Sequence, residues 1–335
     1  MEQKEFKLLS VREEDKLSES EKRKYYSELR EYCKTRKLTN TTPGALTVAP
    51  KLKGMVERIA KSLCKILGGS DVKIVTDGLE NIPEGPVIFA STHQGMLDNF
   101  CWLPDCPKHT LIFHGLETSK ALLLAQWDIG LILVTKDKEN ISHRTNAKLD
   151  MISALIRGTS VWMAPETAWN LSPNKLHLPL NFGFIDIAKK ANVPIVPLII
   201  EYTYDTSSDK EKLTQIHIRY GEPITVAMDD SLIDKLEEYQ EIISTIRWEL
   251  IEEKRLFERK NISNWDYVNF VKGNLRNLKM GKISIDRERA GIQGANQEFY
   301  QFHHINDVPW DVWGNLLETE EVRRLRRINS KNLII

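Results

Sequence analysis

The chain lacks a net charge and lacks any long apolar run. Lys plus Arg and Asp plus Glu number 47 each in 335 residues, so composition gives no argument for nucleic acid binding. No apolar stretch approaches the roughly 18 residues that a membrane-spanning helix needs. The charged residues after Met1 do not resemble a signal peptide. We therefore expect a cytoplasmic protein, with any membrane contact being peripheral and on the inner face of the membrane.

Cysteines are few, and their spacing fits neither a disulfide framework nor a metal site. Cys33, Cys64, Cys101 and Cys106 form no CxxC pair and have no paired histidine ligands. The sequence predicts a reducing compartment, no metal and no organic prosthetic group. Cys101 and Cys106 are close enough in sequence to suggest a nucleophile, but we interpret them as buried structural thiols. The Gly-x-Ser-x-Gly turn of serine hydrolases is also missing.

Hydrophobic residues make up 41% of the chain, enough for a large core, and their patterning divides the chain into three regions. Residues 1–70 form an N-terminal helical segment with two amphipathic patterns. In residues 71–257, short apolar runs alternate with helical patterns. This alternation predicts an α/β domain with a mostly parallel or mixed central sheet flanked by helices. Residues 258–335 form a C-terminal extension with less regular patterning.

The second N-terminal helical pattern has two interpretations. Its apolar residues recur at helical spacing, which suits a helix packed on the main domain. They are Met55, Ile59, Leu63, Ile66 and Leu67. Basic residues give the same pattern a charged face, which suits a helix lying on a membrane surface. They are Lys51, Lys53, Arg58, Lys61 and Lys65. The tryptophans and arginines of the C-terminal extension also suggest contact with anionic lipid.

The segment Thr92–Asp98 is the most informative about function, because it places a histidine and an aspartate five positions apart. It follows the apolar run Pro86–Ala90, a predicted strand, so His93 and Asp98 would lie where a strand of an open α/β sheet ends. A carboxylate bonded to one ring nitrogen fixes the imidazole tautomer and leaves the other nitrogen to take a proton from a hydroxyl. The chemistry indicated is acyl transfer. Alone, the spacing also fits a satisfied histidine beside a helix-capping aspartate.

Three later segments extend this pattern. Gly130–Lys136 is an apolar strand that ends in a basic residue, Ala164–Asn170 contains a Pro-Glu pair, and Val193–Pro197 is an apolar run flanked by prolines. Together with the histidine–aspartate pair, these segments make residues 71–225 resemble the glycerophospholipid acyltransferase superfamily. That superfamily contains 1-acylglycerol-3-phosphate acyltransferases and soluble glycerol-3-phosphate acyltransferases.

The resemblance implies an O-acyltransferase in which His93 is the general base and Asp98 orients it. The donor would be acyl-CoA or acyl carrier protein, and the acceptor a hydroxyl of a lysophospholipid or a glycerol phosphate. Attack would be direct, with no acyl-enzyme. The candidate substrate-binding residues are Gly95, Lys136, Pro165, Glu166, Thr167, Trp169, Asn170 and Lys175.

Two candidate residues have more specific expected roles. Gly95 permits close approach of the backbone to a substrate, and its amide is a candidate donor to the oxyanion. Glu166 has two interpretations. It is either a partner of the acceptor hydroxyl or of the network near His93, or a structural anchor of its turn.

Departures from the family pattern leave the chemical class of the acceptor undecided. Trp169 stands where the family has a phosphate-binding arginine, and Thr167 stands where it has glycine. Tryptophan suits sugar or polyol faces better than phosphate, so a glycan, glycolipid or polyol acceptor is an alternative. Lys136, Lys175 or Arg144 would supply the cationic contacts for a phosphate. A non-catalytic lipid-binding protein on this fold is a further alternative.

Overall fold

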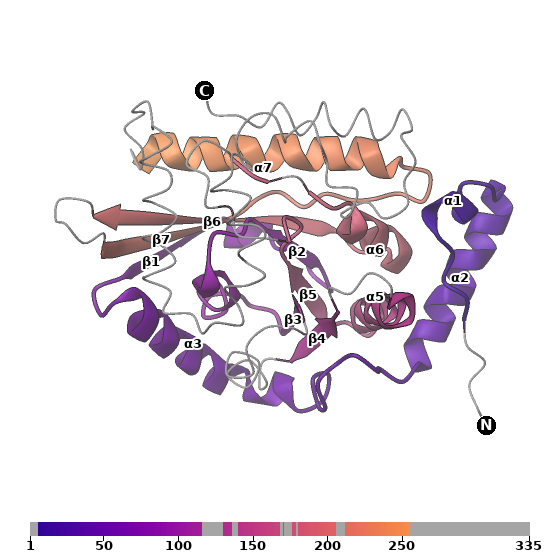
Figure 1. Cartoon of the computed structure of the whole chain (residues 1–335), viewed down its shortest axis with the longest axis horizontal. Helices are drawn as coiled ribbons and strands as arrows, with labels where there is room; N and C mark the ends of the chain where they lie inside the picture. The colour runs from indigo at the N-terminus through magenta and orange to yellow at the C-terminus, as the bar shows by residue number, and fades with distance from the viewer. Residues whose placement is uncertain are drawn as a thin grey trace.

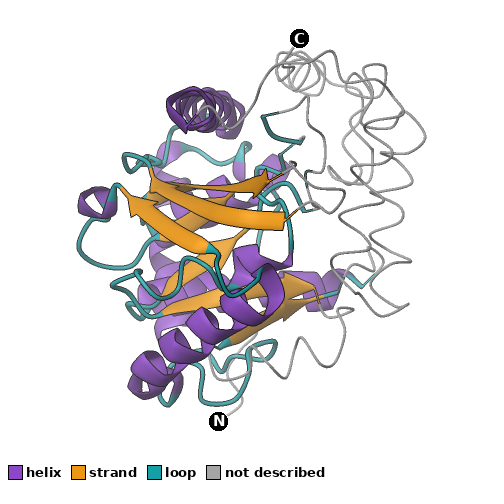
Figure 2. Ribbon diagram, turned by 90° about the vertical axis from the view of Figure 1, so that its left-hand side faces the viewer, coloured by secondary structure: helices purple, strands orange, loops and turns teal. Residues whose placement is uncertain are grey.

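The computed structural model shows a central sheet with helices on both faces (Figures 1 and 2). The described residues are 6–115, 130–135, 140–167, 170, 176–178, 180–205 and 212–254. The expected α/β class is confirmed. The C-terminal extension lies outside the described residues, so its predicted boundaries stay predictions.

The sheet of the described residues has seven strands in the order β1-β7-β6-β2-β5-β3-β4. They are β1 (Lys73–Asp77), β2 (Ile88–Ser91), β3 (Thr110–Gly115), β4 (Leu131–Val134), β5 (Ser160–Met163), β6 (Ile195–Asp205) and β7 (Lys212–Tyr220). Neighbours from β6 to β4 are parallel, whereas β7 is antiparallel to β6 and parallel to β1. The sheet is therefore mixed. The carboxyl ends of β2 and β5 meet at one edge, where β6 runs past the end of β2.

Helices cover both faces of this sheet, as Figure 1 shows. The α-helices are α1 (Val11–Glu14), α2 (Glu19–Thr35), α3 (Lys53–Gly68), α5 (Ile141–Ile156), α6 (Gly183–Ala191) and α7 (Leu232–Lys254). Short 3-10 turns are η1 (Ala49–Leu52), η2 (Leu79–Asn81) and η3 (Met96–Asn99). The helices α2, α5, α6 and α7 share one core with the sheet, and α3 and η3 share the other. Within the described segments, no helix combines the length and apolarity needed to cross a bilayer.

The central strand β2 contributes to both cores. Ile88 and Ala90 belong to the core under α5, α6 and α7, whereas Phe89, and Val87 just before the strand, belong to the core under α3. Successive side chains of a strand point to opposite faces. All four side chains are fully buried. This burial on both faces explains why the sequence shows a continuous apolar run rather than an alternating one.

The helix α2 is part of the main core. Leu29 and Cys33 of this helix are completely buried beside α5. Arg36, which follows α2, forms a buried ion pair with Asp150 of α5. The same carboxylate accepts the backbone N–H of Asn40 at 2.8 Å. The first N-terminal helical pattern is therefore packed against the α/β domain.

Candidate active site

The loop that follows β2 brings His93 and Asp98 together. Nδ1 of His93 lies 2.9 Å from Oδ2 of Asp98. The chain leaves β2 at Ser91 and turns into η3, so the two residues meet across a turn rather than along a helix. The Asp98 side chain is fully buried, whereas that of His93 keeps 16% of its surface exposed. Residues 92–98 are called the His93 loop below.

The Asp98 carboxylate accepts hydrogen bonds on both oxygens. Oδ2 accepts the backbone N–H groups of Gln94 at 2.5 Å and Gly95 at 2.8 Å, in addition to its contact with His93. Oδ1 accepts the phenol O–H of Tyr202 on β6. Because a carboxylate only accepts, the imidazole presents its N–H at Nδ1 and its lone pair at Nε2. The arrangement fixes the tautomer of the imidazole, and Nε2 is the ring nitrogen that does not bond Asp98.

The Gly95 amide has a hydrogen-bond partner within the His93 loop. Its N–H donates to Asp98, so this amide is not directed at a substrate oxyanion. Its φ of −178° is extended backbone that any residue adopts. A Cβ at this position would lie 3.2 Å from Cε2 of Tyr202, which is closer than ordinary contact. Glycine at this position therefore makes room for the Tyr202 ring.

Glu166 reaches the His93 loop from the chain that follows β5. Its Oε1 accepts the His93 backbone N–H at 2.8 Å, and its Oε2 accepts the Leu178 N–H at 2.8 Å. Both oxygens therefore bind backbone, and the side chain is buried. Burial raises the pKa of Glu166 to about 7. These contacts fit a network partner of His93 that also anchors two loops, rather than a group presented to the acceptor hydroxyl.

The segment around Glu166 also holds other predicted site residues. The Asn170 N–H donates to the His93 carbonyl at 2.5 Å, and the Pro165 carbonyl accepts a backbone N–H at 3.1 Å. Thr167 is exposed with a φ of 58°, a left-handed conformation that disfavours a β-branched residue and that glycine adopts freely. Three predicted residues lie outside the described part of the chain: Lys136, Trp169 and Lys175.

A buried ion pair behind the site was not predicted. Arg247 of α7 pairs with Glu201 of β6, with 2.6 Å between Nε and Oε2. The Gln94 side chain donates to the same Glu201 carboxylate at 2.6 Å. The helix α7 is thereby linked to the His93 loop. A single sequence gives no signal for this role, because Arg247 is one of many charged residues in a long helix.

Aromatic rings and thiols lie behind the histidine. Trp162 of β5 meets His93 edge to face, with ring centroids 6.2 Å apart, and stacks on Trp102 at 6.1 Å. Both tryptophans are buried. Cys101 and Cys106 are buried in the same core, and burial raises the pKa of each thiol. Neither thiol is therefore poised to act as a nucleophile.

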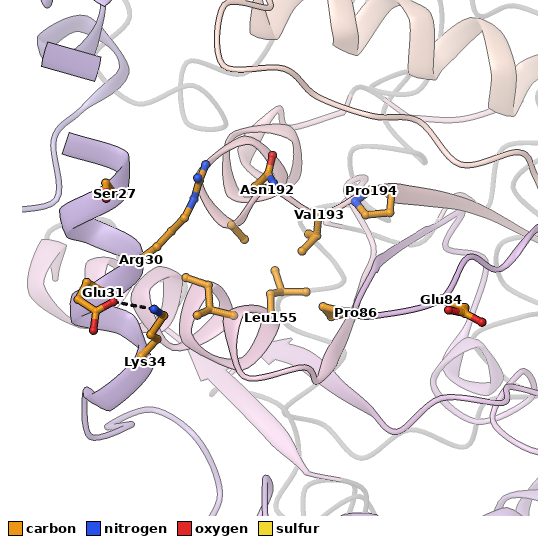
Figure 3. A pocket seen from close by; sticks show the side chains of 12 residues that line it. Ser27, Arg30, Glu31, Lys34, Glu84, Pro86, Leu155, Asn192, Val193 and Pro194 are labelled. Atoms are coloured by element: carbon orange, nitrogen blue, oxygen red, sulfur yellow. Dashed lines mark hydrogen bonds and ion pairs between the residues drawn. The ribbon is translucent and has the colours of Figure 1, made fainter. Parts of the chain in front are cut away.

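A cavity of about 540 Å³ lies at the opposite edge of the sheet (Figure 3). Its lining includes Arg30 and Lys34 of α2 and Pro86 and Pro194, which precede β2 and β6. Since those strands are parallel to each other, their starting ends lie away from the loop that carries His93. This cavity is separate from the candidate active site.

The chain is similar in sequence to known acyltransferases. Residues 73–201 match the family model described as Acyltransferase. The chain is 27% identical over 133 residues to the 1-acyl-sn-glycerol-3-phosphate acyltransferase alpha of Ovis aries, and 27% identical over 138 residues to that of Mus musculus. Each match covers 39% of this chain and 45% of the relative, so the chain spans less than half the length of these relatives.

A solved structure is also similar in part. It is the crystal structure of the 1-acyl-sn-glycerophosphate (LPA) acyltransferase, PlsC, from Thermotoga maritima. The match has a TM-score of 0.44 and 18% sequence identity, and it covers 61% of this chain and 81% of that chain. In sequence, residues 73–201 are therefore similar to acyltransferases, and the relatives named above are 1-acyl-sn-glycerol-3-phosphate acyltransferases.

Proposed function

We propose that the protein is an O-acyltransferase that moves a fatty acyl group from an acyl thioester to a hydroxyl of a lysophospholipid or a glycerol phosphate. The observation that carries the proposal is the 2.9 Å contact between His93 and a fully buried Asp98, with the imidazole still partly exposed. The pair follows the central parallel strand β2, at the edge of the sheet where α/β active sites form. The relatives named above act, by their names, on 1-acyl-sn-glycerol-3-phosphate.

In the proposed reaction, Nε2 of His93 removes the proton of the acceptor hydroxyl as its oxygen attacks the thioester carbonyl carbon. Asp98 stabilises the imidazolium that forms. The tetrahedral intermediate collapses, the carbon–sulfur bond breaks, and the thiol leaves with the proton from the imidazolium. Acyl-CoA or acyl carrier protein supplies the thioester. Attack is direct, and the buried cysteines take no part as nucleophiles.

A glycan, glycolipid or polyol acceptor is the second candidate. It is favoured by Trp169 in place of the phosphate-binding arginine of the family pattern. The chemistry at His93 would be unchanged. A non-catalytic lipid-binding role is disfavoured, because lipid binding alone has no need for a histidine aligned on a buried carboxylate with donors on both oxygens.

The test is product formation by the purified full chain with labelled acyl-CoA or acyl carrier protein and a panel of acceptors. Phosphate-bearing lysolipids should be labelled, and His93→Ala should lower the rate by about 10²–10⁴-fold, the usual contribution of a general base. The control is His109→Ala, which removes an imidazole that bonds the Ala45 carbonyl elsewhere in the fold. Unchanged turnover in folded His93→Ala would refute the proposal. Labelling of sugar-bearing acceptors alone would select the second candidate.

A further inference from the structure

The cavity at the edge of the sheet opposite the candidate active site has no role in the proposed function. Its walls come from α2, from the ends of α5 and α6, and from the segments that precede β2 and β6 (Figure 3). Its volume of about 540 Å³ falls within the range of small-molecule sites, about 300–1,000 Å³. Such sites combine an apolar lining with a few polar groups that orient the ligand. The lining of this cavity therefore indicates which ligand fits it.

The apolar part of the lining is aliphatic. It consists of Leu155, Ile156, Pro86, Ala191, Val193 and Pro194. Leu155, Ala191 and Val193 are buried and belong to the core that α2 shares with α5 and α6. None of the 12 lining residues is aromatic, so the cavity offers no ring on which an aromatic ligand could stack. This part of the lining suits a saturated hydrocarbon body.

Arg30 of α2 brings a positive charge to the cavity without a counter-charge. Its Nε donates to the Lys190 carbonyl at 2.9 Å, which directs the guanidinium from α2 toward α6 (Figure 3). The Tyr26 ring lies on another side, with its centroid 5.9 Å from Cζ. Within the described segments, Arg30 forms no ion pair, and burial lowers its pKa because no carboxylate offsets the cost of desolvation. An anionic ligand group would supply the missing partner.

The other charged residues of the lining have partners of their own. Lys34 pairs with Glu31 at 2.6 Å, as the dashed line in Figure 3 shows. Glu84 is exposed and interacts electrostatically with Lys108. Among the described lining residues, Arg30 is therefore the charged group left for a ligand. A guanidinium presents two parallel N–H groups that match the two oxygens of a carboxylate.

Two neutral polar side chains line the cavity together with Arg30. They are Ser27 of α2 and Asn192, which follows α6. Neither side chain bonds another protein group in the part of the chain that the structure describes. Asn192 has a φ of 58°, a left-handed conformation that asparagine tolerates better than most residues. A hydroxyl and an amide are thus available for the polar head of a ligand.

We infer that this cavity is a second binding site, which takes a carboxylate with a saturated hydrocarbon body, such as a free fatty acid. The carboxylate binds the guanidinium of Arg30, and the hydrocarbon lies along the aliphatic lining. The ligand contacts both α2 and the end of α6, so its binding stabilises the packing of α2 on the domain. The site lies where β2 begins, whereas the His93 loop follows the other end of that strand. The inference goes beyond the proposed function and does not depend on it.

Isothermal titration calorimetry of the full chain with sodium octanoate, at concentrations where octanoate is monomeric, tests binding without turnover. Octanoate should bind saturably and raise the thermal midpoint, because it binds the folded state. Octan-1-ol lacks the charge, acetate lacks the hydrocarbon and octylamine carries the opposite charge, so each should bind at least about tenfold more weakly. Absence of saturable octanoate binding would overturn the inference. Equal or tighter binding of octan-1-ol or octylamine would overturn it too.

Arginine variants locate the bound carboxylate. Arg30→Gln should weaken octanoate binding at least about tenfold, because the amide carries no charge. The matched control is Arg157→Gln. Arg157 also joins α2 to the domain, since its Nε donates to the Cys33 carbonyl at 3.2 Å, but it does not line the cavity. Octanoate binding should be unchanged in Arg157→Gln. Equal affinities of Arg30→Gln and the wild type would place octanoate elsewhere and overturn the inference.

Filling the cavity is an independent test. Ser27→Phe should block octanoate binding and leave the thermal midpoint unchanged, because Ser27 is exposed. Ser62→Phe makes the same change at an exposed serine of α3, outside the cavity, and should bind octanoate like the wild type. Wild-type affinity in folded Ser27→Phe would contradict the site. The proposed function is tested separately, because His93→Ala should lose acyl transfer and still bind octanoate.

Discussion

Replacing Tyr202 by phenylalanine removes one oxygen from the site and nothing else. The phenol donates to Oδ1 of Asp98, a carboxylate that is fully buried and so has no water to replace the lost donor. A hydrogen bond to a charged group contributes about 1.5–3 kcal/mol, and we expect Tyr202→Phe to destabilise the fold by that amount. Asp98 keeps its donors on Oδ2, including the Gly95 N–H at 2.8 Å, so His93 stays partly oriented.

The kinetic effect of Tyr202→Phe should fall on kcat. With one hydrogen bond fewer, the Asp98 carboxylate is held less rigidly, so the imidazole is aligned for proton transfer less often. A loss of about 1.4 kcal/mol of transition-state stabilisation lowers kcat about tenfold. Since its phenol bonds Asp98 rather than substrate in this arrangement, KM should change little. The assay is steady-state turnover with acyl thioester and acceptor, together with urea unfolding.

A matched tyrosine separates positioning from stability. Tyr26 of α2 is also buried and donates to a buried carboxylate, Glu14, at 2.9 Å. Tyr26→Phe should cost similar stability and leave kcat unchanged. Equal kcat for folded Tyr202→Phe and the wild type would refute the positioning argument, and so would equal losses of kcat in the two variants.

The remaining predictions concern the groups around the His93 loop. The pKa of Glu166 is raised from 4.5 to about 7, so its contribution to stability falls as pH rises between those values, by on the order of 3 kcal/mol. Glu166→Gln should flatten that decline when thermal midpoints are measured across this pH range. Parallel pH profiles of the wild type and the variant would contradict this prediction. Arg247→Ala leaves Glu201 buried without its cation and should cost about 3–5 kcal/mol in urea unfolding. A loss of unfolding free energy below about 1 kcal/mol would contradict a stabilising role for the Arg247–Glu201 pair. Gly95→Ala should lower kcat by crowding Tyr202, and an unchanged kcat would argue against that crowding.

The strands and the histidine–aspartate pair were predictable because their signals are local. Burial of β2 on both faces required a continuous apolar run, which the sequence shows from Val87 to Ala90. The His93 and Asp98 spacing required only a turn after that strand. The extent of β6 was not predictable, because Glu201 to Asp205 is polar and pairs with β7 through its backbone.

The supporting contacts of the site were missed because they join residues far apart in the sequence. Tyr202 meets Asp98 across 104 positions, and Arg247 meets Glu201 across 46 positions. Tyrosine and arginine are common on strands and helices, so neither residue type marks a site by itself. Only the packing of β6 and α7 against the His93 loop gives these side chains their partners.

The link between α7 and the His93 loop has a practical consequence for making shorter versions of this protein. The segment that matches the acyltransferase family ends at residue 201. A chain cut there would keep the histidine and its aspartate yet discard the phenol and the guanidinium that hold them in place. The smallest unit able to fold into a working site therefore extends at least through Arg247, well beyond the region that sequence similarity outlines.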